Sequence, residues 1–388
     1  MTRVAYFGYD SANTNIRRRV EGFQDDGVAV TGFMMRRNDG GRVDWDNVDL
    51  GRTFDGAYIQ RVRSIFSGAK RAAAAREKLA ECDVILARNL DMLATALLAK
   101  KYTGARLPVI YECLDVHRLL TRHDPIGFLF RRFEGWMLSK CACVVVSSPG
   151  FEEHYFQRRH RGKYAKAVLI DNRLSRGVDL GPRPAKDERA RAGKLRIGWL
   201  GMLRCRRSLD ILLNVAREFP DEAEVHLHGL PALTEIPDFD EKVRLLPNLI
   251  YHGRYKWPDD LARLYGDLDV VWAGDFWDAG YNSVWLLPNR LYEGGYYAVP
   301  PIAPKGTQTA RWAMDRGVGF EASEDLMVTL PELVGRLIAD RRLIAEKREK
   351  LLSLPDNHFV QPRGVHSRLV AEVLRGRPRP EPTLVSSK

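Results

Sequence analysis

Three arginines crowd the point where an apolar, strand-like run gives way to a helical pattern. Arg204, Arg206 and Arg207 follow the run Leu195 to Leu200 and precede the helical segment Leu209 to Glu218. Guanidinium groups can fork onto phosphate oxygens, and the free amides at a helix start add partial positive charge. The segment therefore predicts an anion-binding site, and the alternative is a solvated basic turn.

A carboxylate and a helix start stand together in the segment from Asn282 to Ala303. Pro288 and Asn289 suit the first positions of a helix, which places Glu293 one turn in. There a carboxylate can hold sugar or ribose hydroxyls while the helix end faces a diphosphate. The alternative is that Glu293 is an ordinary surface acid.

The N-terminal half offers two candidates for proton transfer, Asp115 and His117, just after the strand-like run Val109 to Glu112. Histidine needs little adjustment of its pKa to work near neutral pH, whereas an aspartate would act as a base or an orienting partner. An equally weighted alternative has Asp115 capping the following helix with His117 packed nearby. Asp10 and Ser11 follow the first strand-like run in a tight polar turn, and we expect this loop on the acceptor side.

These candidates need elements that end at one edge of a sheet. Short apolar runs alternate with longer helical patterns, which is the signature of parallel sheets with crossover helices. Two such series predict an α/β fold of two Rossmann-like, doubly wound domains that face a central cleft. We expect domains at residues 1–174 and 194–362, a linker at 175–193, a helix at 363–375 that could return to the first domain, and a disordered tail at 376–388.

Size and charge are consistent with this organisation. A chain of 388 residues exceeds the length at which one hydrophobic core stops growing. The formal net charge of +11 and a pI near 9.4 favour anionic partners: nucleic acid, a phosphorylated ligand or an acidic membrane face. The positive residues are dispersed and no recognised RNA or DNA module occurs, so nucleic-acid binding is the less favoured function.

Several familiar site types are missing. No Gly-x-Gly-x-x-Gly fingerprint follows the first strand and no Walker loop occurs. Asp-x-Asp, a metal motif, occurs at residues 44–46, 238–240 and 267–269, and three occurrences in one chain show how unspecific it is. Five cysteines without metal-ligand spacing argue against a disulfide framework or a zinc site. His226 and His228 alternate along an expected strand and are assigned structural roles.

The N-terminus enters a strand-like stretch directly and no apolar run reaches membrane-spanning length, so we expect a cytoplasmic protein. The aromatic and basic segment Phe128 to Met137 precedes basic residues between Arg158 and Lys166. Together they could rest on an anionic bilayer surface. The alternative is a core helix with a solvated basic flank.

The motif that contains Glu293 resembles a known family. Pro-Asn-Arg-Leu-Tyr-Glu at residues 288–293, followed by Gly-Gly-Tyr-Tyr-Ala-Val-Pro-Pro-Ile-Ala at 294–303, looks like the donor-site motif of GT-B glycosyltransferases. It is particularly similar to that of bacterial enzymes of exopolysaccharide assembly. The similarity covers nearly the whole chain and includes residues 111–117, 145–149 and 204–207.

By this resemblance, Glu293 takes the place of the second of two glutamates that many members carry eight positions apart, which implies a contact with the ribose of a nucleotide. Trp285 occupies the position of the first glutamate. The contact with the transferred sugar must then come from elsewhere, and Asn282 or the loop 275–280 are the candidates.

The resemblance also implies a metal-independent donor site. Arg204 and Arg207 occupy the positions of a basic pair that neutralises the diphosphate leaving group, and such positive charge replaces a metal. Asn289 and Arg290 complete the expected donor-binding set. No metal and no cofactor are expected beyond a nucleotide-diphosphate sugar as co-substrate.

The reaction implied is transfer of one sugar from a nucleotide-diphosphate sugar to an oligosaccharide acceptor, expected to be lipid-linked, in surface-polysaccharide biosynthesis. Domain closure would bring Asp115 or His117 toward the donor. A nucleotide-sugar epimerase on the same fold is the nearest alternative, and it would convert the donor without an acceptor. The expected location is the cytoplasm, with peripheral attachment at the inner face of the cell membrane.

Overall fold

A computed structural model of the protein describes residues 1–37, 43–53, 58–185 and 193–376. Residues 186–192 of the expected linker and residues 377–388 of the expected tail lie outside this description. The chain divides into two compact units, and each is described by itself.

The first unit combines three stretches of the chain, residues 1–146, 159–168 and 363–388, and the second comprises residues 147–158 and 169–362. Residues 147–158 and 169–174, which the sequence analysis assigns to the first domain, thus belong to the second unit. The helix expected at 363–375 belongs to the first.

A seven-stranded sheet forms the centre of the described part of the first unit, in the order β3-β2-β1-β4-β5-β6-β7. The pairs that involve β1 to β6 are parallel. Chain order reverses direction between β1 and β4, the place where doubly wound sheets bind ligands. The strands are β1 (Arg3–Gly8), β2 (Ala29–Arg36), β3 (Asn47–Arg52), β4 (Val84–Arg88), β5 (Val109–Cys113), β6 (Cys143–Val146) and β7 (Ala167–Leu169).

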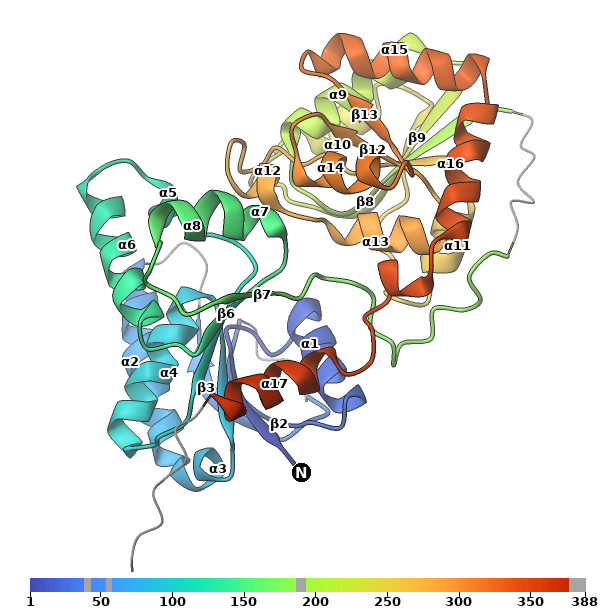
Figure 1. The fold of residues 1–388 in the computed structure, drawn as a ribbon. Helices are drawn as coiled ribbons and strands as arrows, with labels where there is room; N and C mark the ends of the chain where they lie inside the picture. The colour runs from blue at the N-terminus through green and yellow to red at the C-terminus, as the bar shows by residue number, and fades with distance from the viewer. Residues whose placement is uncertain (38–42, 54–57, 186–192, 377–388) are drawn as a thin grey trace, which may run out of the picture. The chain divides into compact units, whose positions relative to one another are not determined.

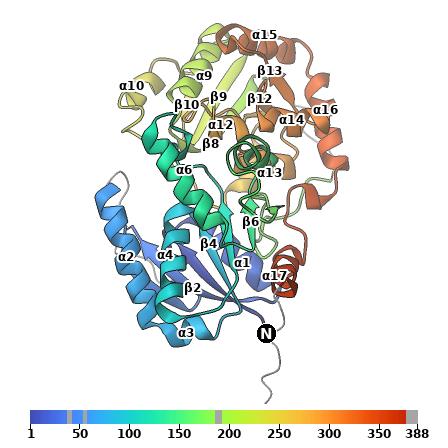
Figure 2. The same cartoon turned by 60° about the vertical axis from the view of Figure 1, so that its left-hand side comes forward.

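Helices cover both faces of this sheet. Figures 1 and 2 show α2 and α4 over one face and α1 and α17 over the other. The helices are α1 (Thr14–Asp25), α2 (Tyr58–Ala74), α3 (Arg76–Ala80), α4 (Asn89–Thr103), α5 (Arg118–Thr121), α6 (Pro125–Leu138) and α17 (Val365–Arg375).

The second unit repeats the architecture with six parallel strands among its described residues, in the order β10-β9-β8-β11-β12-β13. Its direction reverses between β8 and β11. The strands are β8 (Leu195–Leu203), β9 (Ala223–Pro231), β10 (Leu249–Tyr251), β11 (Val270–Trp272), β12 (Pro301–Pro304) and β13 (Phe320–Ala322).

The helices of the second unit flank both faces of its sheet, with α9 and α15 lying side by side on one of them (Figure 1). They are α7 (Pro149–Phe151), the π-helix η1 (Glu152–Phe156), α9 (Arg206–Glu218), α10 (Phe239–Val243), α11 (Leu261–Gly266), α12 (Asn282–Trp285), α13 (Asn289–Tyr296), α14 (Gln308–Asp315), α15 (Leu326–Ala339), α16 (Arg342–Ser353) and the 3-10 helix η2 (Asp356–His358), while α8 (Gln157–Arg159) spans the unit boundary. The predicted α/β class with two Rossmann-like, doubly wound sheets is confirmed.

Helix α9 shows how the apolar pattern builds the core. Leu209, Leu212 and Ala216 recur every three to four residues and are fully buried against the sheet. From the sheet side, Trp199 and Trp272 enter the same cluster. Within the described residues, no helix combines the length and the apolar character needed to cross a bilayer.

The last helix, α17, docks on the first unit through Asp26, which ends α1. The Asp26 carboxylate accepts hydrogen bonds from the backbone N–H groups of Gly364, His366 and Ser367, at 2.6, 2.8 and 3.3 Å. An acid at a helix N-terminus satisfies amides that have no partner inside the helix and complements the helix dipole. Asp26 therefore fixes where α17 begins.

A buried ionic cluster lies beneath the sheet edge of the first unit, centred on Glu112 at the end of β5. Its carboxylate accepts from Arg88 Nε at 2.7 Å, from Arg19 Nε at 2.6 Å and from the Tyr6 hydroxyl at 3.1 Å. Burial alone would raise the pKa of Glu112, but Arg88 and Arg19 outweigh it and lower the pKa to about 2. Arg19 also donates to Nε2 of His366, at 2.9 Å, so α17 joins the cluster.

The low pKa of Glu112 predicts a pH-dependent contribution to stability. Its folded pKa of about 2 lies below the ordinary 4.5, so the contribution is complete above about pH 5 and is lost as the pH falls toward 2. Glu112→Gln leaves two buried guanidinium groups without their anion, which costs about 3–5 kcal/mol at pH 7. Urea unfolding of both proteins at pH 7 and pH 3.5 should show a gap that narrows in acid; a constant gap would contradict the assignment.

Candidate functional site

In the second unit, Arg290 ties together the two strands that flank the reversal point. Its buried guanidinium donates to the carbonyl oxygen of Leu200 at 3.1 Å and to that of Gly274 at 2.9 Å. Leu200 lies near the end of β8, and Gly274 lies just after β11. Burial lowers the pKa of Arg290, while the nearby Asp275 opposes this shift. Arg290 thus positions the two strand-end loops, and its direct contact with a donor stays a prediction.

Cys205 connects the same two loops and starts α9. Its Sγ accepts from the N–H of Ser208 at 3.3 Å, which caps the helix, and from the N–H of Phe276 at 3.2 Å. The sequence analysis gave this residue no role, because a lone thiol in a basic turn carries no spacing signal. Cys205 therefore holds residues 204–207, the arginine turn, against the loop after β11.

Two arginines of that turn stack on aromatic rings of the neighbouring loop. The guanidinium carbon of Arg204 lies 4.2 Å from the Trp277 ring centroid, and that of Arg207 lies 4.5 Å from the Phe276 centroid. Arg204 also approaches Asp275, with 3.7 Å between Nη2 and Oδ2. Stacking orients a guanidinium while leaving its N–H edge able to fork onto an anion.

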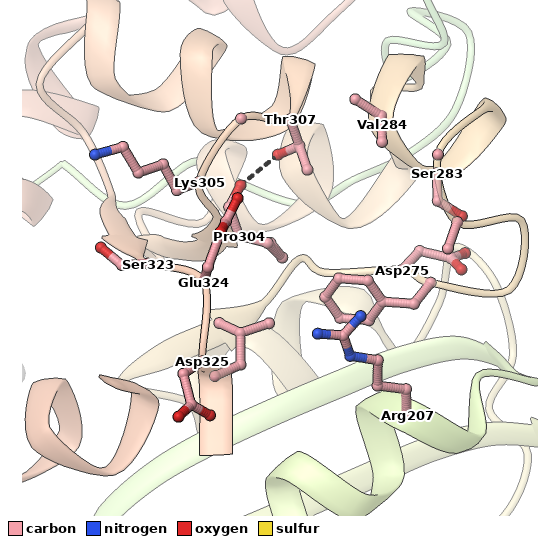
Figure 3. Close-up of a pocket in the computed structure, with 15 residues that line it drawn as sticks. Arg207, Asp275, Ser283, Val284, Pro304, Lys305, Thr307, Ser323, Glu324 and Asp325 are labelled. Atoms are coloured by element: carbon pink, nitrogen blue, oxygen red, sulfur yellow. Dashed lines mark hydrogen bonds between the residues drawn. The ribbon is translucent and has the colours of Figure 1, made fainter. Parts of the chain in front are cut away.

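A pocket of about 360 Å³ opens beside Arg207. Figure 3 shows Arg207, Asp275 and Ser283 on one side of it and Lys305, Glu324 and Asp325 on the opposite side. The pocket thus gathers residues from four strand-end loops, those that follow β8, β11, β12 and β13. The lining residues are Arg207, Asp275, Phe276, Ala279, Gly280, Ser283, Val284, Pro304, Lys305, Gly306, Thr307, Ser323, Glu324, Asp325 and Leu326.

The other expected donor residues take different places. Asn282 is buried at the start of α12, where its side-chain amide donates to Asp278 at 2.5 Å. It therefore shapes the loop 275–280 from within. Asn289 begins α13 as expected and is partly exposed. Trp285, at the position of the missing glutamate, is buried against aromatic rings that include Phe151 and Tyr155.

Glu293 lies inside α13, and its side chain is only 3% exposed. Its Oε1 accepts from the Trp257 indole N–H at 3.2 Å and its Oε2 from the Tyr265 hydroxyl at 3.1 Å. This is not the ordinary surface acid of the alternative interpretation. Trp257 and Tyr265 hold the carboxylate in one orientation, and its contact with ribose stays a prediction.

In the first unit, Tyr9 marks the place where two strand-end loops meet. Burial raises the pKa of its hydroxyl, and the charges of Arg88, Arg37, Asp115 and Asp10 act on it in addition. The Asp10 carboxylate accepts from the Ala12 N–H at 3.2 Å within the turn that includes Ser11. Asp10 after β1 and exposed Asp115 after β5 are therefore brought to the same edge of the sheet.

His117 is the N-cap of α5. The alternative to a catalytic role had expected a helix cap here, but at Asp115. Its Nδ1 accepts from the Leu119 N–H at 3.2 Å, and its Nε2 lies 3.3 Å from Arg61 Nη1. Burial lowers the pKa of His117, and the positive charge of Arg61 lowers it further. The imidazole is therefore neutral at pH 7, and its part in catalysis stays a prediction.

Asn89, which directly follows β4 and begins α4, is a further candidate at this edge of the sheet. Its φ of 68° lies in the left-handed region, which is strained for a residue other than glycine. Its buried side-chain oxygen has no hydrogen-bond partner among the described residues. An isolated Asn gives no sequence signal for such strain, which here adjoins Arg88 at the reversal point of the sheet.

Comparison with known proteins shows the family. No protein-family model matches the chain. The succinoglycan biosynthesis protein ExoL of Rhizobium meliloti is 38% identical over 344 residues, which cover 87% of this chain and 85% of ExoL. The chain belongs to the ExoL family. The predicted membership of an exopolysaccharide-assembly group is thereby confirmed.

Solved structures confirm the GT-B fold. HepE of Anabaena, determined in complex with UDP and glucose, superposes with a TM-score of 0.71 at 15% identity, over 97% of this chain and all of HepE. Sucrose-phosphate synthase of Thermosynechococcus elongatus gives a TM-score of 0.71 at 15% identity, over 97% of this chain and 98% of that protein. The ExoL-family chain thus has the fold of GT-B glycosyltransferases, as its sequence predicted.

The geometry predicts different effects for two adjacent arginines. Arg207→Ala should weaken binding of a nucleoside diphosphate about 10- to 100-fold, because a hydrogen bond to a charged group contributes about 1.5–3 kcal/mol. Arg206→Ala is the matched control: Arg206 forms a bidentate pair with Asp238, at 3.0 and 2.7 Å, and does not line the pocket. Titration calorimetry measures both. Equal affinities of the two variants would contradict the assignment.

Proposed function

We propose that this ExoL-family glycosyltransferase transfers a sugar from a nucleotide-diphosphate sugar to a lipid-linked oligosaccharide during exopolysaccharide assembly. The observation that carries the proposal is the pair Arg204 and Arg207, stacked on Trp277 and Phe276 beside a pocket at the carboxyl ends of the strands. HepE, which shares the fold, has been determined with UDP and with UDP-glucose.

The arginine pair is proposed to stabilise the departing nucleoside diphosphate. Negative charge grows on the diphosphate as its bond to the sugar breaks, and fixed positive groups stabilise that charge without reorganising. The start of α9 adds amide dipoles of the same sign. This arrangement supplies the electrostatic part of catalysis from the chain's own residues.

Glu293 is proposed to receive the ribose hydroxyls of the donor. An ionised carboxylate only accepts hydrogen bonds, and it can accept one from each of two hydroxyl groups of a ribose. Trp257 and Tyr265 already fix its orientation, so the group is organised before the donor arrives. Asn282 and the loop 275–280 are the proposed contacts for the transferred sugar.

The strand ends of the first unit are proposed to hold the acceptor. Tyr9 offers an aromatic ring, and Asp10, Ser11 and Asn89 offer polar groups at the same edge of the sheet. Asp115 is the proposed base that takes the proton of the attacking hydroxyl, because it is exposed, whereas His117 is occupied as a helix cap. His117 is the second candidate for this role.

The function requires that a label from the donor sugar reach an acceptor. With labelled UDP-glucose and membranes from cells that make the polysaccharide, the wild type should move label into the lipid-extractable fraction. Glu293→Gln should lose at least about 90% of this activity, since removing one hydrogen bond to a charged group costs about 1.5–3 kcal/mol. Glu332→Gln, at an exposed position of α15, is the control.

Two results would overturn parts of this proposal. Full transfer by Glu293→Gln would remove Glu293 from the donor site. Conversion of UDP-glucose or other nucleotide-diphosphate sugars without added membranes, to an isomer of the donor, would replace transfer by epimerisation.

We propose in addition that α6 rests on an anionic bilayer, where a lipid-linked acceptor resides. The inner face of this helix is anchored by Glu134, which binds the His160 imidazole at 2.8 Å and the Tyr111 hydroxyl at 3.3 Å. The outer face then carries large exposed apolar side chains, which are Ile126, Phe128, Leu129, Phe133 and Trp136, between 46% and 64% exposed. A helix that served only to fill the hydrophobic core would bury most of these side chains.

Basic groups accompany this apolar surface and select an anionic partner. Arg132 is exposed within α6 itself, Arg159 is exposed at the end of α8, and Arg161 and Lys163 are exposed in the loop that follows α8. Lys163 packs against α6 at Gly135, where an added Cβ would lie 2.8 Å from the lysine side chain. A helix with aromatic groups on the outside and a basic border is typical of proteins that lie at a membrane interface.

Vesicle binding tests this surface. Wild-type protein should sediment with vesicles that contain anionic phosphatidylglycerol and much less with neutral phosphatidylcholine vesicles. Replacing both Phe128 and Trp136 by Ser should lower the partition coefficient at least about tenfold, since each side chain contributes about 1–2 kcal/mol of apolar burial. Leu245→Ser, at a 60% exposed leucine of the second unit, is the control and should bind like wild type.

A further inference from the structure

Three histidines of the second unit form a cluster outside the donor pocket. His226 and His228 lie on β9, and His252 directly follows β10. Each histidine contributes one ring nitrogen to a group of three nitrogens that all lie within 4.8 Å of one another. Neither the resemblance to known families nor the proposed reaction uses these residues.

Strand geometry brings the three imidazoles together. Alternate residues of a strand project to one face, so His226 and His228 share a face of the sheet. Tyr251 of β10 is in register with Leu227 of β9, and the N–H of His252 donates to the Leu227 carbonyl at 2.9 Å. His252 therefore comes to lie beside the two histidines of β9, and the backbone ladder fixes its place.

The rings contact one another in two ways. His226 Nδ1 lies 2.9 Å from His252 Nε2, and the His228 ring stacks on the His252 ring with 4.2 Å between centroids. Zinc binds imidazole nitrogen at about 2.0–2.1 Å in tetrahedral geometry, which puts neighbouring nitrogens about 3.3 Å apart. Ligation therefore requires the ring of His252, which is exposed, to turn about its side-chain bonds toward that spacing.

The surroundings keep the imidazoles able to ligate. Burial lowers the pKa of His228 to about 3, and it also lowers the pKa of His226 and of His252. Only a neutral imidazole can give its lone pair to a metal. His226 Nε2 lies 3.3 Å from Glu224 Oε2, the kind of carboxylate that orients a metal-binding histidine.

We propose that His226, His228 and His252 bind one divalent cation that prefers imidazole ligands, of the zinc type, and that it cross-links β9 and β10. The cation takes the position of the hydrogen-bonding proton between His226 and His252, and that proton moves to the other nitrogen of its own ring, which stays neutral. A hydrogen-bonded stack of three imidazoles without metal is the competing explanation. The proposed site is structural and is separate from the proposed donor site.

The site predicts a saturable, one-to-one interaction. Full-length protein freed of metal with EDTA should bind Zn²⁺ in titration calorimetry with micromolar or tighter affinity and should unfold at a higher temperature with Zn²⁺ present. Co²⁺ should give visible d–d bands without a thiolate charge-transfer band, since the ligands are nitrogens and not one of the five cysteines.

Variants separate the proposal from the competing explanation. His252→Ala replaces an exposed side chain, so the variant should keep its fold. It should weaken Zn²⁺ binding at least tenfold, and His226→Gln should do the same. His154→Ala removes a histidine outside the cluster and should bind Zn²⁺ like wild type. The proposal is overturned if wild type shows no saturable binding, or if His252→Ala binds Zn²⁺ as tightly as wild type.

Discussion

The second unit of the protein depends on one buried guanidinium. Arg290 donates to the carbonyl oxygens of Leu200 and Gly274, and these carbonyls belong to the two strands that flank the reversal point of the sheet. A buried cation is costly unless its donors are used, and these two hydrogen bonds offset part of the cost of burying Arg290. The spacing between the arginine turn and the aromatic loop follows from this requirement, and Cys205 reinforces it.

The first unit also buries a charged group near the reversal point of its sheet, but that group is negative. Its reversal point lies between β1 and β4, and the buried group nearby is the carboxylate of Glu112, compensated by Arg88 and Arg19. The two sheets have equivalent topology but different electrostatics. A cation under the strand ends suits a half that is proposed to hold a diphosphate.

Much of the fold could be predicted from the sequence, because strand and helix patterns are local. The runs at Val84 and Val109 became buried parallel strands, and α13 begins at Asn289 as its preceding proline indicated. The edge strand β3 was not predicted. Its residues Asn47–Arg52 carry only two apolar side chains and a glycine, so their strand conformation comes from pairing with β2 and not from their own pattern.

The site was predictable in part for the same reason. The arginine turn stands out locally, and Arg207 does line a pocket. The partners that give each group its role are distant in sequence. Trp257 donates to Glu293, Arg290 donates to the carbonyl of Leu200, and Arg61 lies beside the His117 ring. No spacing rule links such positions. Likewise, alternation could place His226 and His228 on one face, but only strand register brings His252 to them.

The docking of α17 bears on how the protein is made. Asp26 and Arg19 leave the ribosome long before their partner His366, which follows them by 340 and 347 residues. The second unit lies almost wholly between them in the chain, so its sequence is available to fold while the first unit still lacks a helix. During synthesis one face of the first unit's sheet therefore stays incompletely covered until α17 has been made.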